Sequence, residues 1–156
     1  MNKEYLLNSL VKEIKMLTKI TDSIITQSRQ HYIKLNLPET YRELLAAGIS
    51  DDYSMGYGSI NGFRSSYCMP YKWYDLGQEK ITNLTIHPFC YMDANSFFEQ
   101  RLNADQALEE MKYYYQIVKE VNGELITIWH NHFLGTDKMF GGWRNIYQSF
   151  IDDCLL

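Results

Sequence analysis

Apolar side chains recur at helical spacing in four segments of the chain. In the first segment they are separated by four, four and three positions, which places on one helix face Leu6, Leu10, Ile14 and Leu17. Three further helices are predicted over residues 38–48, 103–122 and 143–151. Asn103 and Gln106 have the spacing of a capping box at the start of the third predicted helix.

Shorter runs rich in β-branched and apolar residues predict strands over residues 24–26, 51–57, 81–90 and 125–129. Residues 24–26 are β-branched throughout, so we expect a buried strand there. Residues 125–129 form a nearly continuous apolar run, which is typical of a strand buried on both faces of a parallel sheet. Residues 56–80 are rich in aromatic side chains, and we interpret them as a long functional loop.

Helices and strands alternate along the chain, and this order predicts an α/β fold built around a parallel sheet. The length of 156 residues fits a single domain, residues 1–156. The chain is 46% hydrophobic and 22% charged, which excludes disorder for most of it. No apolar run approaches the roughly 18 residues of a membrane span, and no signal peptide is recognisable. We therefore expect a soluble, cytoplasmic protein with no membrane partner.

Charge and cysteine content narrow the classes of function. The net charge is -4 and the basic residues are scattered, which argues against a nucleic-acid partner. Cys68, Cys90 and Cys154 are too few and too widely spaced for a disulfide framework or a CxxC zinc site. Aromatic residues make up 15% of the chain, which suits a core, an interface or a sugar-binding cleft.

Three of the four histidines, His31, His87 and His130, fall at or just after the end of a predicted strand. Active sites of parallel α/β proteins gather at the carboxyl ends of strands, although strand ends are polar places in any case. His130 and His132 are two positions apart and point to the same side of an extended chain. With His31 as a further candidate ligand, they can bind zinc or another divalent ion. A general acid–base role for His130 is equally compatible with its position.

Arg29 and Arg64 lie in polar, loop-forming segments. Either guanidinium can clamp a carboxylate through two hydrogen bonds, and for Arg64 a surface ion pair explains the sequence equally well. The acidic residues best placed near the predicted strand ends are Asp51, Asp52, Asp75 and Asp93. The pair at 51 and 52 is also consistent with a simple turn.

The aromatic segment around residues 70–75 contributes Tyr71 and Trp73 as candidate sugar-binding side chains, and Trp129 beside His130 is a third. Their flat rings can stack on a sugar. A cover over the end of the sheet, or a subunit contact, explains the same aromatic segment.

Four segments together resemble a known family: Ser28-Arg29-Gln30-His31-Tyr32, Asp52-Tyr53-Ser54-Met55-Gly56-Tyr57, Gly62-Phe63-Arg64 and Ile128-Trp129-His130-Asn131-His132. In combination they are similar to the C-terminal half of bacterial polysaccharide deacetylase-like proteins. These proteins are relatives of carbohydrate esterase family 4, and the similarity is to a divergent branch from gut-type Bacteroidota. The resemblance runs from about residue 5 to the end of the chain.

The resemblance implies a distorted (β/α)7 barrel and the metal-dependent hydrolysis of acetyl groups on sugars. One Asp and two His would hold a divalent ion such as zinc. His130 looks like the late-strand histidine that acts as acid toward the leaving group. Arg29 looks like the arginine that orients the catalytic base, with His31 in place of the usual proline two residues on. Asp52, or its neighbour Asp51, looks like the family's fourth motif.

The metal motifs and the base of that family lie in the N-terminal half of its barrel, and nothing in this chain matches them. We therefore expect a partial (β/α)7-type barrel with mostly parallel strands and flanking helices, catalytically silent by itself. Its open sheet edges would be paired in a homodimer, covered by the N-terminal helix, or completed by an N-terminal half. The alternative function is a non-catalytic carbohydrate-binding or assembly module.

Overall fold

The computed structural model describes residues 3–154, with side chains from residue 9 onward. Contacts within the chain group into two compact units. The first unit extends to Ser54 and includes Pro70–His87, and the second comprises Met55–Met69 and the chain from Pro88 onward. The expectation that they form a single domain stays a prediction.

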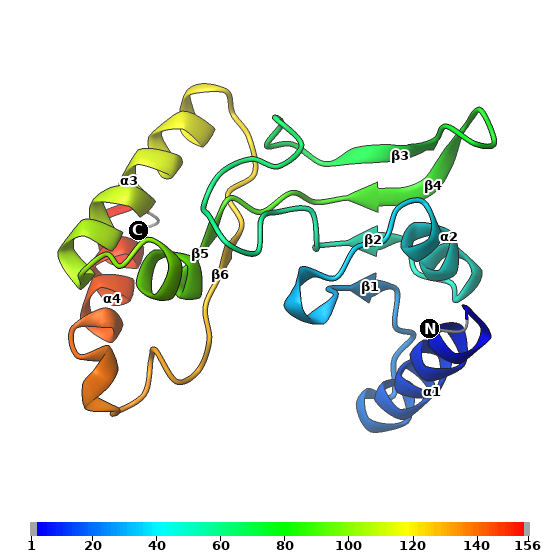
Figure 1. Ribbon diagram of the computed structural model, residues 1–156, viewed down its shortest axis with the longest axis horizontal. Helices are drawn as coiled ribbons and strands as arrows, with labels where there is room; N and C mark the ends of the chain where they lie inside the picture. The colour runs from blue at the N-terminus through cyan, green and yellow to red at the C-terminus, as the bar shows by residue number, and fades with distance from the viewer. Residues whose placement is uncertain (1–2, 155–156) are drawn as a thin grey trace. The chain divides into compact units, whose positions relative to one another are not determined.

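The first unit contains a four-stranded sheet (Figure 1). The strands are β1 (Gln27–Ser28), β2 (Asp51–Asp52), β3 (Tyr71–Asp75) and β4 (Lys80–Ile86), in the spatial order β1-β2-β4-β3. β1, β2 and β4 are parallel, and β3 is antiparallel to β4. The helices of this unit are α1 (Lys3–Thr21) and α2 (Glu39–Ala46), with a short turn at His31–Ile33 after β1.

Alternation along β4 builds the core of the first unit. Thr82, Leu84 and Ile86 are buried, whereas Ile81 and Asn83, on either side of Thr82, are exposed, as the period of a strand requires. The turn from β3 to β4 is tied to α2 by an ion pair. Arg42 donates two hydrogen bonds of 2.7 Å to the carboxylate of Asp75.

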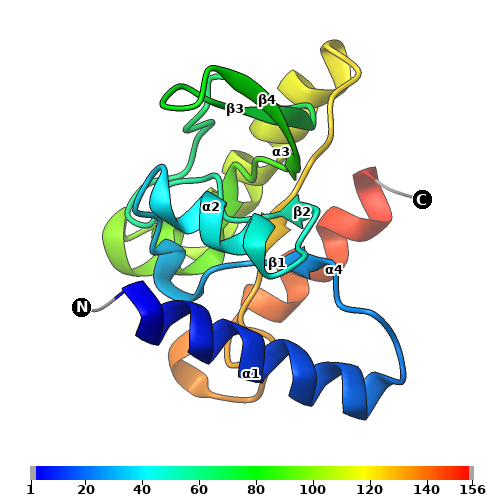
Figure 2. The same cartoon turned by 90° about the vertical axis from the view of Figure 1, so that its right-hand side faces the viewer.

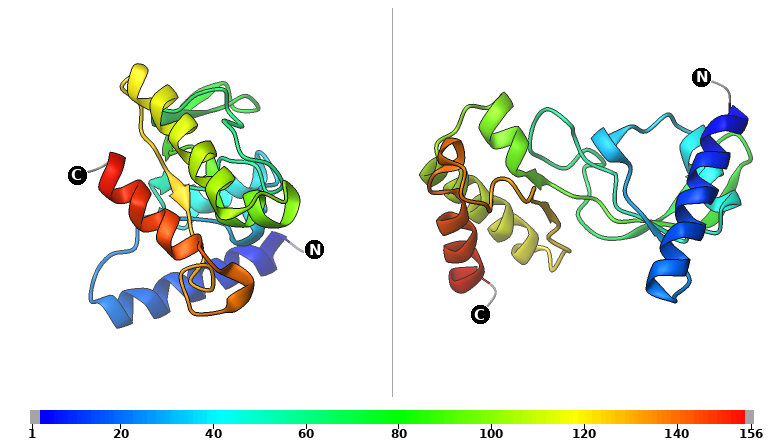
Figure 3. Two further views of the ribbon diagram at one scale, coloured as in Figure 1. Left: turned by 90° about the vertical axis from the view of Figure 1, so that its left-hand side faces the viewer. Right: turned by 90° about the horizontal axis from the view of Figure 1, so that it is seen from below.

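The second unit combines two short parallel strands with two helices (Figure 3). The strands are β5 (Tyr91–Met92) and β6 (Thr127–Ile128), and the helices that pack against each other are α3 (Ala104–Glu120) and α4 (Trp143–Cys154). A π-helical turn at Asn95–Glu99 follows β5, and a 3₁₀ turn at Lys138–Phe140 precedes α4. The core is largely aromatic, with Tyr91, Phe133, Phe140, Trp143 and Phe150 buried together.

The helix predictions are confirmed to within a few residues. At the start of α3 both halves of the predicted capping box are present: Asn103 Oδ1 accepts from the N–H of Gln106 at 2.9 Å, and Gln106 Oε1 accepts from the N–H of Asn103 at 3.0 Å. In α1 the predicted apolar face is only partly buried, because Leu17 is 42% exposed. Leu6 of that face lies outside the described side chains. Among the described helices, none is both long and apolar enough to cross a membrane.

The α/β class with mostly parallel strands is confirmed, and no barrel is detected among residues 3–154. The prediction of a buried strand at residues 24–26 is wrong, because Ile24 is 86% exposed and β1 begins only at Gln27. Pairing with the β2 segment starts at the carbonyl of Thr26, which accepts from the N–H groups of Ser50 and Asp51. The β-branched residues 24–26 therefore belong to the connection between α1 and β1.

The interpretation of residues 56–80 as one long loop is also wrong, because they include β3 and the start of β4. Only four residues separate these strands, from 76 to 79, which is enough for an antiparallel turn but far too few for a parallel crossover. The strand predicted at 125–129 is reduced to Thr127–Ile128, of which only Ile128 is buried. β5 was not predicted as a separate strand.

Candidate functional site

Each unit gathers polar side chains where its parallel strands end. In the first unit Asp52 closes β2, and Arg29 and His87 directly follow β1 and β4, so the three lie at one edge of the sheet. In the second unit Asp93 and His130 lie at the carboxyl edge of the β5–β6 pair. The prediction that histidines follow strand ends is confirmed for both His87 and His130.

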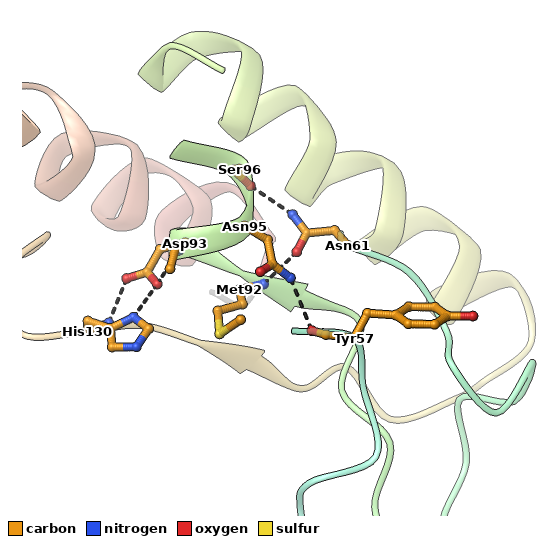
Figure 4. A network of polar contacts seen from close by, with 8 residues as sticks. Tyr57, Asn61, Met92, Asp93, Asn95, Ser96 and His130 are labelled. Carbon is orange, nitrogen blue, oxygen red and sulfur yellow. Dashed lines mark hydrogen bonds and ion pairs between the residues drawn. The ribbon is translucent and has the colours of Figure 1, made fainter. Parts of the chain in front are cut away.

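In the second unit, the carboxylate of Asp93 is buried and contacts His130. The side chain of Asp93 is 0% exposed. Its Oδ2 accepts from the backbone N–H of His130 at 2.6 Å, and its Oδ1 lies 2.5 Å from Nδ1 of the same residue (Figure 4). The N–H of Ala94 donates to Oδ1 as well, at 2.6 Å. Burial raises the pKa of Asp93, and the hydrogen bonds from His130 and Ala94 oppose that rise.

The pair leaves one nitrogen of His130 available. The backbone N–H and Nδ1 both face Asp93, so the ring orientation is fixed and Nε2 points away from the carboxylate. The His130 side chain is 40% exposed, and no described residue hydrogen-bonds to its Nε2. An imidazole held by a buried carboxylate, with its second nitrogen accessible, can donate or accept a proton.

Two asparagines hold the segment Met55–Met69 against the chain around Asp93 (Figure 4). The side-chain amide of Asn95 donates to the carbonyls of Tyr57 at 3.2 Å and Ile60 at 2.8 Å. Asn61 accepts from the N–H of Met92 at 2.9 Å and donates to Ser96 Oγ at 2.8 Å. Asn95 begins the π-helical turn, a geometry that is frequent at functional sites. These contacts brace the backbone on both sides of Asp93.

The other predicted residues of the second unit have different surroundings. Trp129 is half-buried, and its ring centroid lies 5.0 Å from that of Tyr147 and 5.8 Å from that of Tyr91, so its indole packs within the unit. His132 is exposed, with its ring centroid 5.4 Å from that of His130. Arg64 is exposed and donates from Nη1 to the carbonyl of Gly56 at 3.3 Å.

In the first unit, Asp52 is a buried carboxylate that the fold itself uses. Its oxygens accept from the N–H of Ser54 at 3.0 Å and from the hydroxyl of Ser54 at 2.9 Å. That hydroxyl in turn accepts from the N–H of Gln30 at 2.8 Å, which links the segments after β1 and β2. Burial raises the pKa of Asp52, and the bonds from Ser54 and the charge of Arg29 oppose the rise. Arg29 and Asp52 thus lie at the same edge of the sheet, at the ends of the paired strands β1 and β2.

Arg29 is exposed, and its Nε donates to the carbonyl of Tyr53 at 3.3 Å. The Tyr53 ring is stacked on His87, with centroids 4.4 Å apart and planes at 14°. His87 Nε2 lies 2.9 Å from Asp51 Oδ1. A hydrogen bond from Ser50, and then the contact with His87, lower the pKa of Asp51. This second carboxylate–histidine pair belongs to a stack of side chains along the edge of the sheet.

The remaining predicted residues also lie in the first unit. Tyr71 begins β3 opposite Ile86, so it stands at the edge where β4 ends. Trp73 is half-buried and packs edge-on against Tyr41, with centroids 5.3 Å apart. His31 is exposed, and its ring lies 4.3 Å from that of Tyr32. The two predicted metal ligands, His31 and His132, therefore belong to different units.

Among the described side chains, no group of three or more His, Cys, Asp or Glu is arranged to hold a metal ion. The set of one Asp and two His that the resemblance implies is therefore not formed by the described residues. The sequence predicts that Asp93 lies near a strand end, but no sequence pattern pairs it with His130, which is 37 positions away. The bracing roles of Asn61 and Asn95 were missed, and no local pattern marks them.

Comparison of the chain with protein-family models, with curated proteins and with solved structures gave no match.

Proposed function

We propose that the chain is a polysaccharide deacetylase-like domain, with the architecture of a partial (β/α)7-type barrel, in which His130 is the acid toward the leaving group. The observation that carries the proposal is the Asp93–His130 pair at the carboxyl edge of β5 and β6, with Nε2 of His130 accessible. The family resemblance and this geometry both support His130 as the acid.

Removing an acetyl group from a sugar breaks a C–O or C–N bond, and the leaving oxygen or nitrogen must gain a proton. His130 Nε2 is the group that delivers it, because Nδ1 faces Asp93. The buried carboxylate of Asp93 holds the ring in one tautomer and stabilises the imidazolium that exists before the transfer. A positioned acid of this kind contributes roughly 10²–10⁴-fold to a rate.

Arg29 and Asp52 enter the proposal as residues of the first unit. The Asp52 carboxylate is occupied by Ser54, so we assign it a supporting role. Arg29 is exposed at that edge of the sheet. We assign it the role that the resemblance implies, which is to orient the carboxylate of the catalytic base. A divalent ion such as zinc stays a prediction, because no residues of this chain match those that hold it in the family.

The proposal is tested by NMR titration of the full chain with acetylated xylotriose and, separately, with unmodified xylotriose. We expect the ring signals of His130 to move with the acetylated sugar and to move less with the unmodified one. Acetate release is measured in parallel with added zinc or cobalt. Any release must fall roughly 100-fold in His130→Gln and remain unchanged in the matched variant His132→Gln. The proposal would be contradicted by acetate release that is unchanged in His130→Gln, or by His130 ring signals that shift with neither sugar.

A non-catalytic carbohydrate-binding module is the second candidate, and the braced segment Met55–Met69 favours it. This segment exposes Tyr57 (36%) and Tyr67 (48%) on a backbone that Asn95 and Asn61 hold in place. Rigidly mounted aromatic rings suit stacking on sugars. Under this candidate, Tyr57→Ala abolishes binding of xylotriose while His130→Gln leaves it unchanged.

A further inference from the structure

A cavity of about 570 Å³ lies in the first unit, within the size range of small-molecule sites. Its walls come from the middle of α1, the chain that follows β1, and α2, which gather in one part of the unit (Figure 2). None of its lining residues belongs to the Asp93–His130 pair or to the second unit. The proposed function uses one of its lining residues, Arg29, but assigns no ligand to the cavity.

The wall that follows β1 has a strained backbone. Tyr32 and Ile33 are consecutive and both have left-handed φ values, 58° and 54°. A β-branched residue such as Ile33 rarely adopts this conformation, so the backbone is strained there. Hydrogen bonds from Ile33 N–H to the Gln30 carbonyl and from Lys34 N–H to the His31 carbonyl close the turn. Backbone strain of this kind concentrates at ligand-binding segments, and this turn carries two of the cavity's basic side chains, His31 and Lys34.

The charges around the cavity balance. Arg29 and Lys34 bring two positive charges, and Glu13 and Glu43 bring two negative ones. Among the lining side chains that the structure describes, His31 is the only other titratable one. An anion or a cation would therefore meet a like charge as well as a counter-charge, which offsets its binding energy. The balance of charges selects against strongly charged ligands.

The other lining groups are suited to hydrogen bonding. Most are hydroxyl or amide side chains, and they are Ser9, Ser28, Gln30, Asn36 and Thr40. Leucines supply the remaining lining surface. Carboxylates accept from hydroxyl groups while guanidinium and ammonium groups donate to them, so a ligand with many hydroxyl groups can use both kinds of charged residue.

We propose that this cavity binds an uncharged, polyhydroxylated ligand, with a short neutral oligosaccharide as the class that fits its size and lining. Glu13 and Glu43 accept hydrogen bonds from the ligand's hydroxyl groups, and Lys34 and the terminal nitrogens of Arg29 donate to its oxygens. The proposal goes beyond the acid role of His130 and requires no chemistry at that residue.

The test is NMR titration of the full chain with xylotriose and chitotriose as uncharged probes and with trigalacturonic acid as the anionic one. We expect an uncharged probe to shift the backbone amide signals of residues 29–36 saturably. Ser9→Trp, which places a large ring in the cavity, abolishes these shifts. Glu43→Gln, which removes a charged acceptor, weakens binding roughly tenfold.

Matched controls keep the test independent of folding and of the proposed function. Lys12→Trp adds the same ring on α1 outside the cavity, and Glu79→Gln removes a carboxylate elsewhere in the unit; both should bind as wild type. His130→Gln should also bind as wild type here, even though it removes the proposed acid. The proposal is overturned if neither uncharged probe shifts residues 29–36, or if trigalacturonic acid binds more tightly. It is equally overturned if Ser9→Trp, with an unchanged melting temperature, binds as wild type.

Discussion

A carboxylate–histidine pair stands at the carboxyl end of parallel strands in each unit, and the two pairs use opposite nitrogens of the imidazole. In the first unit Asp51 meets His87 through Nε2 at 2.9 Å, and the His87 side chain is only 13% exposed against Tyr53. In the second unit Asp93 meets His130 through Nδ1 at 2.5 Å, and the His130 side chain is 40% exposed. The acids differ in the reverse sense, with Asp51 29% exposed and Asp93 0% exposed.

The two pairs differ in which member is buried and which member reaches solvent. In the first unit the ring is covered and the acid reaches solvent, so the pair ties strands together. In the second unit the acid is buried and the ring reaches solvent, so the pair presents Nε2 outward. Proton transfer requires the second arrangement, which is why we place the proposed chemistry at His130 and not at His87.

The largest expected contrast lies in the two acids. Asp93→Ala removes the acceptor for the backbone N–H groups of His130 and Ala94, and it should lower the free energy of unfolding by about 2–4 kcal/mol. Asp51→Ala should cost no more than about 1 kcal/mol, because that acid is partly exposed. Urea unfolding of both variants measures the difference. Equal losses would mean that the two pairs are energetically alike.

The buried carboxylate of the first unit gives the next largest effect. Ser54→Ala removes the hydroxyl that donates to Asp52 and accepts from the N–H of Gln30, and it should cost about 1–2 kcal/mol. Ser59→Ala, at an exposed serine, should stay within about 0.5 kcal/mol of wild type. Urea unfolding again supplies the measurement. A neutral Ser54→Ala would show that Asp52 needs no partner.

The pH dependence of stability should have opposite signs for the two acids. The pKa of Asp51 is lowered, so the stability it contributes is present above its ordinary pKa of about 3.9 and is lost as the pH falls through the lowered value. The pKa of Asp93 is raised, so its contribution is greatest below about pH 3.9 and is lost as the pH rises through the raised value.

Urea unfolding between pH 3 and 7, with Asp51→Asn and Asp93→Asn beside wild type, separates these contributions. Asp51→Asn should reduce the loss of stability in acid, and Asp93→Asn should reduce the loss as the pH rises. Changes of the same sign in both variants would show that burial does not dominate at Asp93.

The smallest expected effect is at His132, the exposed neighbour of His130. His132→Ala should change the free energy of unfolding by less than about 0.5 kcal/mol, because the side chain is exposed. Thermal unfolding of this variant beside His130→Ala checks the value. A loss comparable to that of His130→Ala would assign His132 a structural role that its exposure does not suggest.

The helices could be predicted from hydrophobic periodicity because α2, α3 and α4 each bury one face. The capping box of Asn103 and Gln106 could be predicted because it depends only on residues three positions apart. Strand prediction was weaker because four of the strands are only two residues long and leave almost no pattern. Residues 24–26 are β-branched, but they lie in the connection between α1 and β1 and form no strand.

The candidate site was predictable only in part. The histidines and Asp93 could be placed near strand ends, because apolar runs mark where strands stop. The pairing of Asp93 with His130, and of Asp51 with His87, depends on which strands are neighbours. The amides of Asn61 and Asn95 act across long stretches of chain, which composition and spacing do not reveal.

The tautomer of His130 can be measured directly by a two-bond ¹H–¹⁵N spectrum of the histidine rings at a pH where they are neutral. We predict that His130 carries its proton on Nδ1, facing Asp93, and leaves Nε2 unprotonated and accessible, and that Asp93→Asn changes this tautomer. A His130 ring that is protonated on Nε2 in the wild type, or that keeps the same tautomer in Asp93→Asn, would show that Asp93 does not hold the ring for proton transfer.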